Sequence, residues 1–339
     1  MNPHSQRKHD HVSICLQDDI EHQGTSGFDS YDFVHNALPE IQFDTIDTSV
    51  QLFGRTFAYP LFISGMTGGF DEAKQINGDL AELCSELNIP MVLGSQRSML
   101  HDDSTASTFL ITRERAPQIC LSANIGATEI ADPNNHDDIL RIIETIEANW
   151  LTVHVNPLQE LFQPEGNTNF KGVLKGISDC KNKLSIPVIV KEVGSGISLS
   201  VAQRLHDIGI DGIDVAGKGG TSWSAVEMKR NSRENSEYFK EWGIETSLSL
   251  QSLKSFCKQQ QITLFSSGGI RSSHDIAMSL AMGAQSVGMA RPILLAYHTN
   301  GIDGVKTFIE GMMKDVRRIM FLTGSEHCEA LSHAEYTKR

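Results

Sequence analysis

The chain has 339 residues, of which 40% are hydrophobic and 21% are charged, and its 42 acidic and 29 basic residues give a net charge of -13. This composition is typical of a globular protein and excludes a broad nucleic-acid-binding surface, because such surfaces are strongly basic. No apolar run approaches the roughly 18 residues of a membrane span, which excludes a transmembrane helix. The six cysteines contain no CxxC pair, which excludes the usual zinc sites and disulfide frameworks.

Residues 1–50 are polar and are expected to form an N-terminal arm with one short hairpin. The first residues lack the apolar core of a signal peptide, so a cytoplasmic protein is expected. The arm contains the sequence RKHDH, in which the adjacent cations Arg7 and Lys8 could bind an anionic ligand in an otherwise acidic protein. The alternative for this stretch is a disordered, charged terminus.

Beyond the arm, short apolar runs alternate with segments that carry apolar residues at helical spacing, such as Leu80, Leu83 and Leu87. Strands that alternate with helices imply right-handed βαβ units and a parallel sheet, and eight such units close into a barrel. We therefore predict an α/β fold, a (β/α)8 TIM barrel that forms a single domain over residues 51–339. The eight predicted strands lie within residues 59–66, 90–95, 118–127, 150–156, 186–194, 212–217, 262–269 and 286–294.

A long charged insertion, about residues 222–245, follows the sixth predicted strand. In this fold such insertions lie over the active face, so this one could act as a lid or a subunit contact. The alternative, which the sequence alone favours, is a solvated surface loop.

Polar residues recur where the predicted strands end, which is where barrel enzymes carry their chemistry. A purely structural barrel needs no such set, although any single residue could serve a turn or a helix cap. The candidate site residues at the ends of the first six predicted strands are Met66, Thr67, Gly68, Ser95, Arg97, Asn124, His154, Asn156, Gln159, Glu160, Lys191 and Thr221.

The sequences SSGGIR and MARP follow the seventh and eighth predicted strands and have the composition of a phosphate site. Gly268 and Gly269 allow the backbone to approach a ligand, and N–H groups at the start of a following helix can donate to an anion. Arg271 and Arg291, the latter next to Ala290, can add charge-assisted hydrogen bonds. Because TIM barrels commonly hold phosphate at these two loops, the sequence predicts a phosphate group and, behind it, a flavin. Glycines that only make tight turns are the alternative.

Two strand ends carry groups suited to catalysis. Lys191 ends an apolar strand, so its ammonium is expected at the barrel mouth, where it could stabilise a developing anion; an ion pair with Glu192 or another carboxylate is the alternative. In the sequence HVNPLQE, alternation places His154 and Asn156 on one face, and Glu160 follows in the loop. Glu160 would suit Mg²⁺, whereas a satisfied hydrogen bond is the alternative for His154.

Together these motifs resemble those of the type 2 isopentenyl-diphosphate isomerases, which are FMN-dependent (β/α)8-barrel enzymes. The resemblance runs from RKHDH through MTGG, GSQR, SANIGA, HVNPLQE, VKEVG, KGGTSW and SSGGIR to MARP, so it covers nearly the whole chain. Broader groups of FMN barrels share SGGIR, whereas MTGG, GSQR and HxNxxQE together make the resemblance specific.

The resemblance implies an isomerase of isoprenoid biosynthesis that interconverts isopentenyl diphosphate and dimethylallyl diphosphate by a 1,3-allylic proton shift. It also implies reduced FMN, usually obtained from NADPH, together with Mg²⁺ and a homo-oligomer, either a tetramer or an octamer. In the mechanism it implies, N5 of the reduced flavin is the acid and base, and Gln159 relays or positions the proton.

The resemblance also implies a role for each matching residue. Gln159 and His154 are the catalytic candidates, and Glu160 is the Mg²⁺ ligand. The substrate-binding set is Arg7, Lys8, Ser95, Arg97, His154, Asn156 and Gln159. The FMN-binding set is Met66, Thr67, Gly68, Ser95, Asn124, Lys191 and Thr221, with the phosphate at Gly268, Gly269, Arg271, Ala290 and Arg291.

One departure and three rival functions accompany the resemblance. Ala216 and Lys218 stand where serine and arginine are expected in many relatives. Because Ala216 has no hydroxyl, this departure is expected to weaken FMN binding and not to abolish activity. An FMN-dependent 2-hydroxy-acid oxidase or dehydrogenase would need a histidine base late in the barrel, where the sequence offers only His274. A purine-nucleotide reductase would need a nucleophilic cysteine at a strand end, and a non-catalytic barrel would bind only a phosphate ligand.

Overall fold

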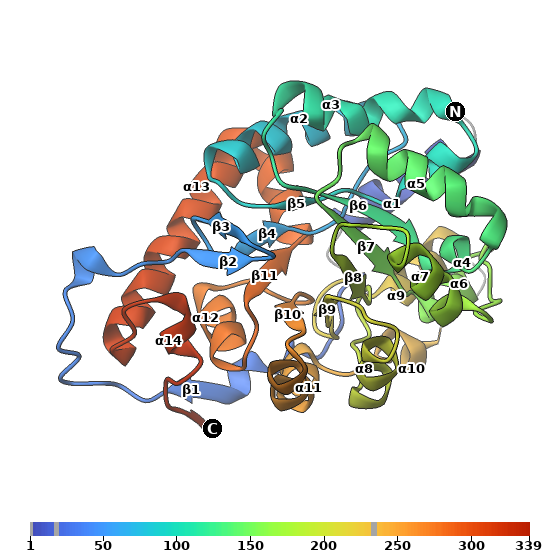
Figure 1. Ribbon diagram of the computed structural model, residues 1–339. Coiled ribbons are helices and arrows are strands. Elements are labelled where there is room, and N and C mark those ends of the chain that lie inside the picture. Colours follow the sequence, from blue (N-terminus) through green and yellow to red (C-terminus); the bar gives the residue numbers. More distant parts are fainter. Residues whose placement is uncertain (1–2, 17–19, 232–235) are drawn as a thin grey trace.

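The structure is a computed structural model that describes residues 3–16, 20–231 and 236–339. Its centre is a closed barrel of eight parallel strands surrounded by helices (Figure 1). The strands follow one another around the barrel in chain order, and the last pairs with the first. They are β4 (Leu61–Ile63), β5 (Met91–Val92), β6 (Leu121–Gly126), β7 (Trp150–His154), β8 (Val188–Lys191), β9 (Gly212–Asp214), β10 (Thr263–Ser266) and β11 (Ser286–Met289). This confirms the predicted TIM barrel and its eight predicted strands.

The helices between the strands bury one apolar face against the barrel, as Ile139, Ile142 and Ile143 do in α5. The longest helix, α13, contains a kink where Asn300 and Gly301 leave helical geometry. The helices of this layer are α2 (Asp71–Glu86), α3 (Ser107–Arg115), α4 (Ala127–Ile130), α5 (His136–Thr145), α6 (Pro157–Phe162), α7 (Val173–Lys181), α8 (Leu199–His206), α11 (Thr246–Gln260), α12 (Ser273–Ala281), α13 (Arg291–Thr323) and α14 (Cys328–Leu331).

Side-chain alternation separates the barrel interior from the surface that the helices cover. In β8, Ile189 packs inward and Val190 packs outward, so Lys191 again points inward, at the C-terminal end of the strand. At the opposite end, Trp150 and the other inward residues form a hydrophobic cluster, and the ring of Phe53 lies 5.3 Å from that of Trp150. Apolar packing therefore fills the N-terminal end of the barrel, so a catalytic site is expected at the C-terminal end.

The arm is more structured than the sequence predicts, because it begins with helix α1 (Pro3–Cys15). Further along, β1 (Tyr31–Phe33) pairs with β12 (Tyr336–Lys338), which joins the arm to the C-terminal end of the chain. A hairpin of β2 (Val50–Leu52) and β3 (Arg55–Phe57) spans the expected boundary at residue 51 and packs on the N-terminal end of the barrel. The arm and the barrel thus share one core.

The insertion forms two helices, α9 (Trp223–Asn231) and α10 (Glu237–Lys240), while residues 232–235 lie outside the described part. Helix α9 packs against α1 and α6. Its residues Ser224, Val226 and Glu227 have no exposed surface, so the alternative of a solvated loop is wrong for α9.

Among the helices of the described residues, none is long and apolar enough to span a membrane.

Candidate active site

Two adjoining cavities lie at the C-terminal ends of the barrel strands. The first, called the glycine-rich cavity below, has an empty volume of about 980 Å³. The second, called the polar cavity, has an empty volume of about 720 Å³. The wall that the two cavities share is formed by His11, Gly65, Met66, Lys191, Val193 and Trp223.

One end of the glycine-rich cavity is built from the loops that follow β10 and β11. Gly268 has a φ of 96°, and a Cβ there would lie 2.1 Å from the carbonyl oxygen of Gly217, so the loop requires glycine. Helix α13 begins at Arg291, directly after Ala290, which places a helix N-terminus at the cavity. Free N–H groups and the helix dipole favour an anion at this point.

The two arginines predicted for the phosphate both contact a carboxylate of the arm, Glu21. Its Oε1 lies 3.0 Å from a terminal guanidinium nitrogen of Arg271 and 2.5 Å from one of Arg291. Arg291 also donates from Nε to the carbonyl oxygen of Cys15 at 2.7 Å. Because Glu21 itself lines the cavity, a phosphate bound by both arginines would have to share them with this carboxylate or displace it.

Lys191 lies in the shared wall, at the barrel mouth as predicted. Its Nζ donates to the backbone carbonyl of Glu192 at 2.6 Å, whereas the Glu192 carboxylate accepts the N–H groups of the next two residues at 2.6 and 2.7 Å. The alternative of an ion pair between these side chains is therefore not what the structure shows. Burial lowers the pKa of Lys191, and the negative charges of Asp214 and Glu192 oppose this effect.

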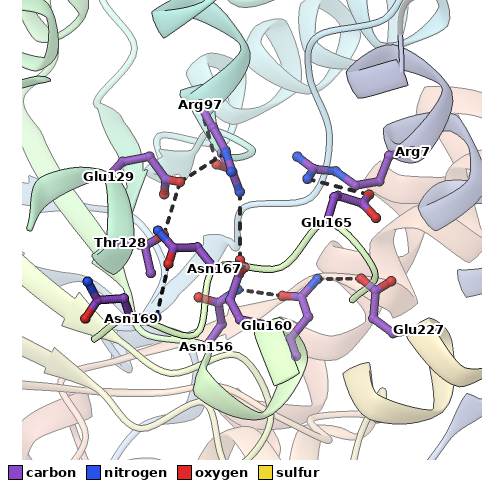
Figure 2. Close-up of polar contacts among 12 residues, drawn as sticks. Arg7, Arg97, Thr128, Glu129, Asn156, Glu160, Glu165, Asn167, Asn169 and Glu227 are labelled. Atoms are coloured by element: carbon purple, nitrogen blue, oxygen red, sulfur yellow. Dashed lines mark hydrogen bonds and ion pairs between the residues drawn. The ribbon is translucent and has the colours of Figure 1, made fainter. Parts of the chain in front are cut away.

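Three predicted cations, Arg7, Lys8 and Arg97, line the polar cavity. Arg97 lies between two carboxylates, with its Nε 3.0 Å from Glu129 and a terminal nitrogen 4.0 Å from Glu160 (Figure 2). Burial and the neighbouring cations Arg7 and Arg97 lower the pKa of Lys8 to about 7. The cavity therefore concentrates positive charge that a dianionic ligand would stabilise.

His154 is held in one tautomer by Asn124. The Asn124 amide donates from Nδ2 to the carbonyl oxygen of Leu93 at 2.8 Å, so its Oδ1 is left to accept from His154 Nδ1 at 2.9 Å. Burial and the cations Lys191 and Lys8 lower the pKa of His154 to about 3. The ring is therefore neutral at physiological pH, with its proton on Nδ1 and a lone pair on Nε2.

The turn after β7 brings three predicted residues together. Pro157 starts α6, where proline fits the first helical position, and this places Gln159 and Glu160 in the first turn. Asn156 donates from Nδ2 to Oε1 of Gln159 at 2.9 Å and to Oε1 of Glu160 at 3.1 Å. The second carboxylate oxygen of Glu160 accepts the backbone N–H of Asn167 at 2.6 Å (Figure 2).

A buried carboxylate of the insertion, Glu227 in α9, links these residues to the arm. Its Oε1 accepts from Gln159 Nε2 at 3.1 Å and lies 2.9 Å from His11 Nε2 of α1. Its Oε2 accepts from Arg230 at 2.9 Å. Burial alone would raise the pKa of Glu227, but the hydrogen bonds from these partners outweigh it and lower the pKa, so the group is ionised.

Most of the predicted site residues line one of the two cavities. The glycine-rich cavity contains Met66, Lys191, Thr221, Gly268, Gly269, Arg271, Ala290 and Arg291. The polar cavity contains Arg7, Lys8, Met66, Ser95, Arg97, Asn124, His154, Asn156, Gln159, Glu160 and Lys191.

Thr67 and Gly68 line neither cavity. The Thr67 side chain is buried, and within the described part of the chain its hydroxyl has no hydrogen-bond partner. A Cβ at Gly68 would lie 2.1 Å from the ring of Phe109, so this glycine allows close packing of the loop. Their assignment to FMN stays a prediction.

Sequence reasoning missed several site residues, chiefly Glu227, Trp223, Glu129 and Glu21. Glu227 lies in the insertion, among other charged residues, and no spacing in the sequence distinguishes it from them. Trp223 directly follows the KGGTS segment, which is the one signal that could have identified it. Glu21 is an ordinary acidic residue of the arm until the fold brings it to the two arginines.

Ala216 and Lys218, which depart from the expected motif, both lie in the loop that follows β9. Ala216 lines the glycine-rich cavity with a φ of 36°, a left-handed conformation that is strained for alanine. Lys218 pairs with Glu241 at 3.2 Å and so connects the loop after β9 to the insertion.

Comparison with known proteins places the chain in a family. The model of the FMN-dependent dehydrogenase family matches residues 5–131 and 159–338. The chain therefore belongs to this family of flavoproteins. The unmatched part, residues 132–158, contains β7 with His154 and also Asn156, two residues of the polar cavity.

Curated relatives show which group within this family the chain resembles. The isopentenyl-diphosphate delta-isomerase of Thermococcus kodakarensis is 40% identical over 336 residues, which cover 96% of this chain and 89% of the relative. That of Chlorobium chlorochromatii is 42% identical over 341 residues, with coverages of 96% and 95%. Within its family, the chain groups with the isopentenyl-diphosphate delta-isomerases.

Solved structures share the fold at low sequence identity. A putative lactate oxidase of Pediococcus acidilactici superimposes with a TM-score of 0.73 at 14% identity, covering 99% of this chain and 93% of that one. A flavocytochrome b2 superimposes with a TM-score of 0.71 at 18% identity, covering 97% and 82%. At these identities the likeness concerns the barrel fold alone.

Proposed function

We propose that the protein interconverts isopentenyl diphosphate and dimethylallyl diphosphate, with FMN in the glycine-rich cavity and the diphosphate, with Mg²⁺, in the polar cavity. One observation carries the proposal: the cations Arg7, Lys8 and Arg97 line the same cavity as the hydrogen-bonded Gln159, and this cavity shares a wall with the predicted flavin site. A diphosphate held there by its charged end would extend its hydrocarbon end toward that wall.

The glycine-rich cavity fits FMN in its chemistry. Two arginines, a helix N-terminus and close-packed glycines stand at one end, as a phosphate requires, and Lys191 stands in the wall at the other. When bound, reduced FMN supplies an electron-rich ring and, at N5, a proton donor and acceptor.

The polar cavity fits Mg²⁺ that arrives with a diphosphate. Among the described residues, no group of three or more His, Cys, Asp and Glu side chains forms a metal site. Mg²⁺ is commonly held by one or two carboxylates together with substrate phosphate oxygens and water, which suits the carboxylate of Glu160, with that of Glu129 in the same cavity. The ion would thus bind together with the substrate.

Each polar side chain then has a task in binding. Arg7, Lys8 and Arg97 neutralise the diphosphate, and Asn156 orients Gln159 and Glu160 through the two hydrogen bonds of its amide. His154 can donate from Nε2 to a phosphate oxygen once its ring takes up a proton, which the negative charge of the ligand favours.

Proton transfer to an unactivated alkene produces positive charge at a tertiary carbon, so the site must stabilise that charge and exclude water. Met66 and Trp223 provide apolar surface in the shared wall. Glu227 fixes the Gln159 amide, which we assign to positioning or relaying the proton. The ionised carboxylate of Glu227 also places negative charge directly behind the Gln159 amide.

The rival hypothesis of a 2-hydroxy-acid oxidase lacks its base. His274 lies in α12, where it packs against Phe33 with ring centroids 6.0 Å apart, and it lines neither cavity. The sequence-based rival of a purine-nucleotide reductase needs a nucleophilic cysteine, but Cys84, Cys120, Cys180, Cys257 and Cys328 are buried. Cys15 lines the glycine-rich cavity, but burial raises the pKa of its thiol to about 12, so it is not an activated nucleophile.

Substrate choice tests the proposal directly. Under anaerobic conditions in D2O, the protein with reduced FMN and Mg²⁺ should convert isopentenyl diphosphate to dimethylallyl diphosphate that carries deuterium, as followed by NMR. Bleaching of oxidised flavin by a 2-hydroxy acid, with no allylic product, would support the oxidase instead.

The proposal extends to the cellular setting. We propose NADPH as the source of reducing equivalents, and the cytoplasm as the location, which agrees with six free cysteines. We also propose a homo-oligomer, tetramer or octamer, because Leu161, Tyr238 and Trp242 expose apolar surface near the insertion.

A further inference from the structure

Asp214 is a buried carboxylate at the barrel mouth. It ends β9 and is the register partner of Lys191, which ends β8. Ile213 packs outward into the core between strands and helices, so Asp214, like Lys191, points into the barrel. The two residues are 2% and 8% exposed, so a carboxylate and an ammonium lie on neighbouring strands in a largely desolvated interior.

The partners of Asp214 are all donors. Ser267 donates from its hydroxyl to Oδ1 at 2.8 Å, and the backbone N–H of Ala216 donates to the same oxygen at 3.2 Å. The other oxygen, Oδ2, is buried and has no hydrogen-bond partner within the described part of the chain. Burial raises the pKa of Asp214, whereas Lys191 and the hydrogen bonds from Ser267 and Ala216 lower it. Donors alone are what an ionised carboxylate accepts, and a buried charge requires a countercharge nearby.

The titratable groups that act on Lys191 are Asp214, Glu192 and His154. The Glu192 carboxylate is turned toward backbone N–H groups of its own loop. Burial, together with Lys191, lowers the pKa of His154 to about 3, so this ring is neutral. Asp214 is thus the carboxylate available to balance the ammonium.

We infer that Asp214 is a positioning residue for the reaction: its carboxylate keeps Lys191 charged at the barrel mouth, where the Glu192 carbonyl holds the ammonium. Through Ser267, the same carboxylate connects this cation to the loop that begins at Gly268. One consequence rests on the proposed function, namely that the charged Lys191 then stabilises negative charge on reduced FMN.

The first test needs no cofactor. Cyanate reacts with a neutral amine, so the pH dependence of Lys191 carbamylation in the apo protein, read by mass spectrometry, reports the ionisation of this lysine. In Asp214→Asn the midpoint should fall by at least about one pH unit, which makes Lys191 about tenfold more reactive near neutrality. Asp207→Asn, at an exposed position after α8, is the matched control and should leave the midpoint unchanged. An unchanged midpoint in Asp214→Asn would overturn the inference.

The second test uses the flavin. The absorbance spectrum of anaerobically reduced FMN distinguishes its anionic from its neutral form, and Asp214→Asn should require a higher pH for the anionic form. In a Lys191→Met background the same substitution should have no further effect, because Asp214 acts through Lys191; additive effects would overturn the inference. If Asp214→Asn does not fold, Asp214→Ser is measured in its place. If the wild-type protein did not bind FMN, the proposed function would be contradicted. The cyanate experiment alone would then test the inference about Asp214.

Discussion

Glu227 of the insertion accepts a hydrogen bond from Gln159 of α6, with 3.1 Å between Oε1 and Nε2. Both side chains are buried, and the oxygen of the Gln159 amide accepts from Asn156 at 2.9 Å. The amide is therefore fixed at both ends, with its nitrogen toward a negative charge and its oxygen toward Asn156. An insertion that looks like surface in the sequence thus positions the principal catalytic candidate.

Glu227→Gln should weaken both catalysis and folding. The amide nitrogen of the new glutamine would face a donor, either Arg230 or the pair of His11 and Gln159, and an unsatisfied buried donor costs about 1–3 kcal/mol. Thermal denaturation should show this loss, and turnover should fall about 100-fold as Gln159 loses its orientation. Glu144→Gln, at an exposed position of α5, is the control. Wild-type turnover in Glu227→Gln would separate this carboxylate from the reaction.

Gln159→Ala should reduce turnover far more than FMN affinity. The side chain lines the polar cavity and not the glycine-rich one, so the cofactor site stays intact. We expect a fall in kcat of about 100-fold or more, with the dissociation constant of FMN within about threefold of the wild type. Gln203→Ala, exposed in α8, should change neither quantity. Equal losses of turnover and FMN binding would count against a catalytic role.

Binding of a diphosphate should draw protons into the site. The pKa of Lys8 is about 7, so above that pH the side chain is largely neutral, and a bound dianion raises the pKa again. Calorimetry at pH 8 in buffers of different ionisation enthalpy should therefore show proton uptake. Lys8→Met should reduce the uptake and weaken binding about 10- to 100-fold, whereas the exposed Lys74→Met should do neither. Proton release, or uptake unaffected by Lys8→Met, would contradict the charge state assigned to Lys8.

Those charge states also predict how stability depends on pH. For Lys8, the pKa of about 7 in the folded protein lies below its ordinary value of 10.5, so between these values the unfolded chain binds more protons. Stability should therefore rise with pH across this interval, and Lys8→Met should remove that part of the slope. Urea denaturation between pH 7 and about 10 measures it, and an unchanged slope would exclude a neutral Lys8 in the fold.

Glu21→Gln should strengthen FMN binding. The carboxylate pairs with Arg271 and Arg291, and an incoming phosphate competes with it for both guanidinium groups. Because the contacts are partly exposed, we expect a modest gain of about three- to tenfold in affinity. Fluorescence titration measures it, with Glu72→Gln at an exposed position of α2 as the control. Weaker binding in Glu21→Gln would mean that the carboxylate orients the arginines instead of competing.

The barrel could be predicted because it depends on local patterns. Each strand reads as a short apolar run, and each intervening helix carries an apolar face, as Ile139 and Ile142 do in α5. Because barrel enzymes carry their chemistry where strands end, the sequence also predicts polar groups such as His154 and Lys191 at the mouth. Both residues line the cavities found there.

The remaining parts of the site depend on contacts between segments that are far apart in the sequence. His11 of the arm and Glu227 of the insertion lie 216 positions apart and meet with 2.9 Å between them. Glu21 reaches Arg291 across 270 positions. No periodicity records such pairs, because they arise only when α1 and α9 fold over the barrel mouth. Helix α1 was missed for the same reason, since its residues carry no clear apolar face.

An anaerobic assay with isopentenyl diphosphate, FMN and Mg²⁺, run with and without NADPH and followed by NMR, decides whether the protein is an isomerase that needs reduced flavin. Dimethylallyl diphosphate should form only when the flavin is reduced, with no net consumption of NADPH per turnover. No product from protein whose flavin is shown to be bound and reduced would contradict this function.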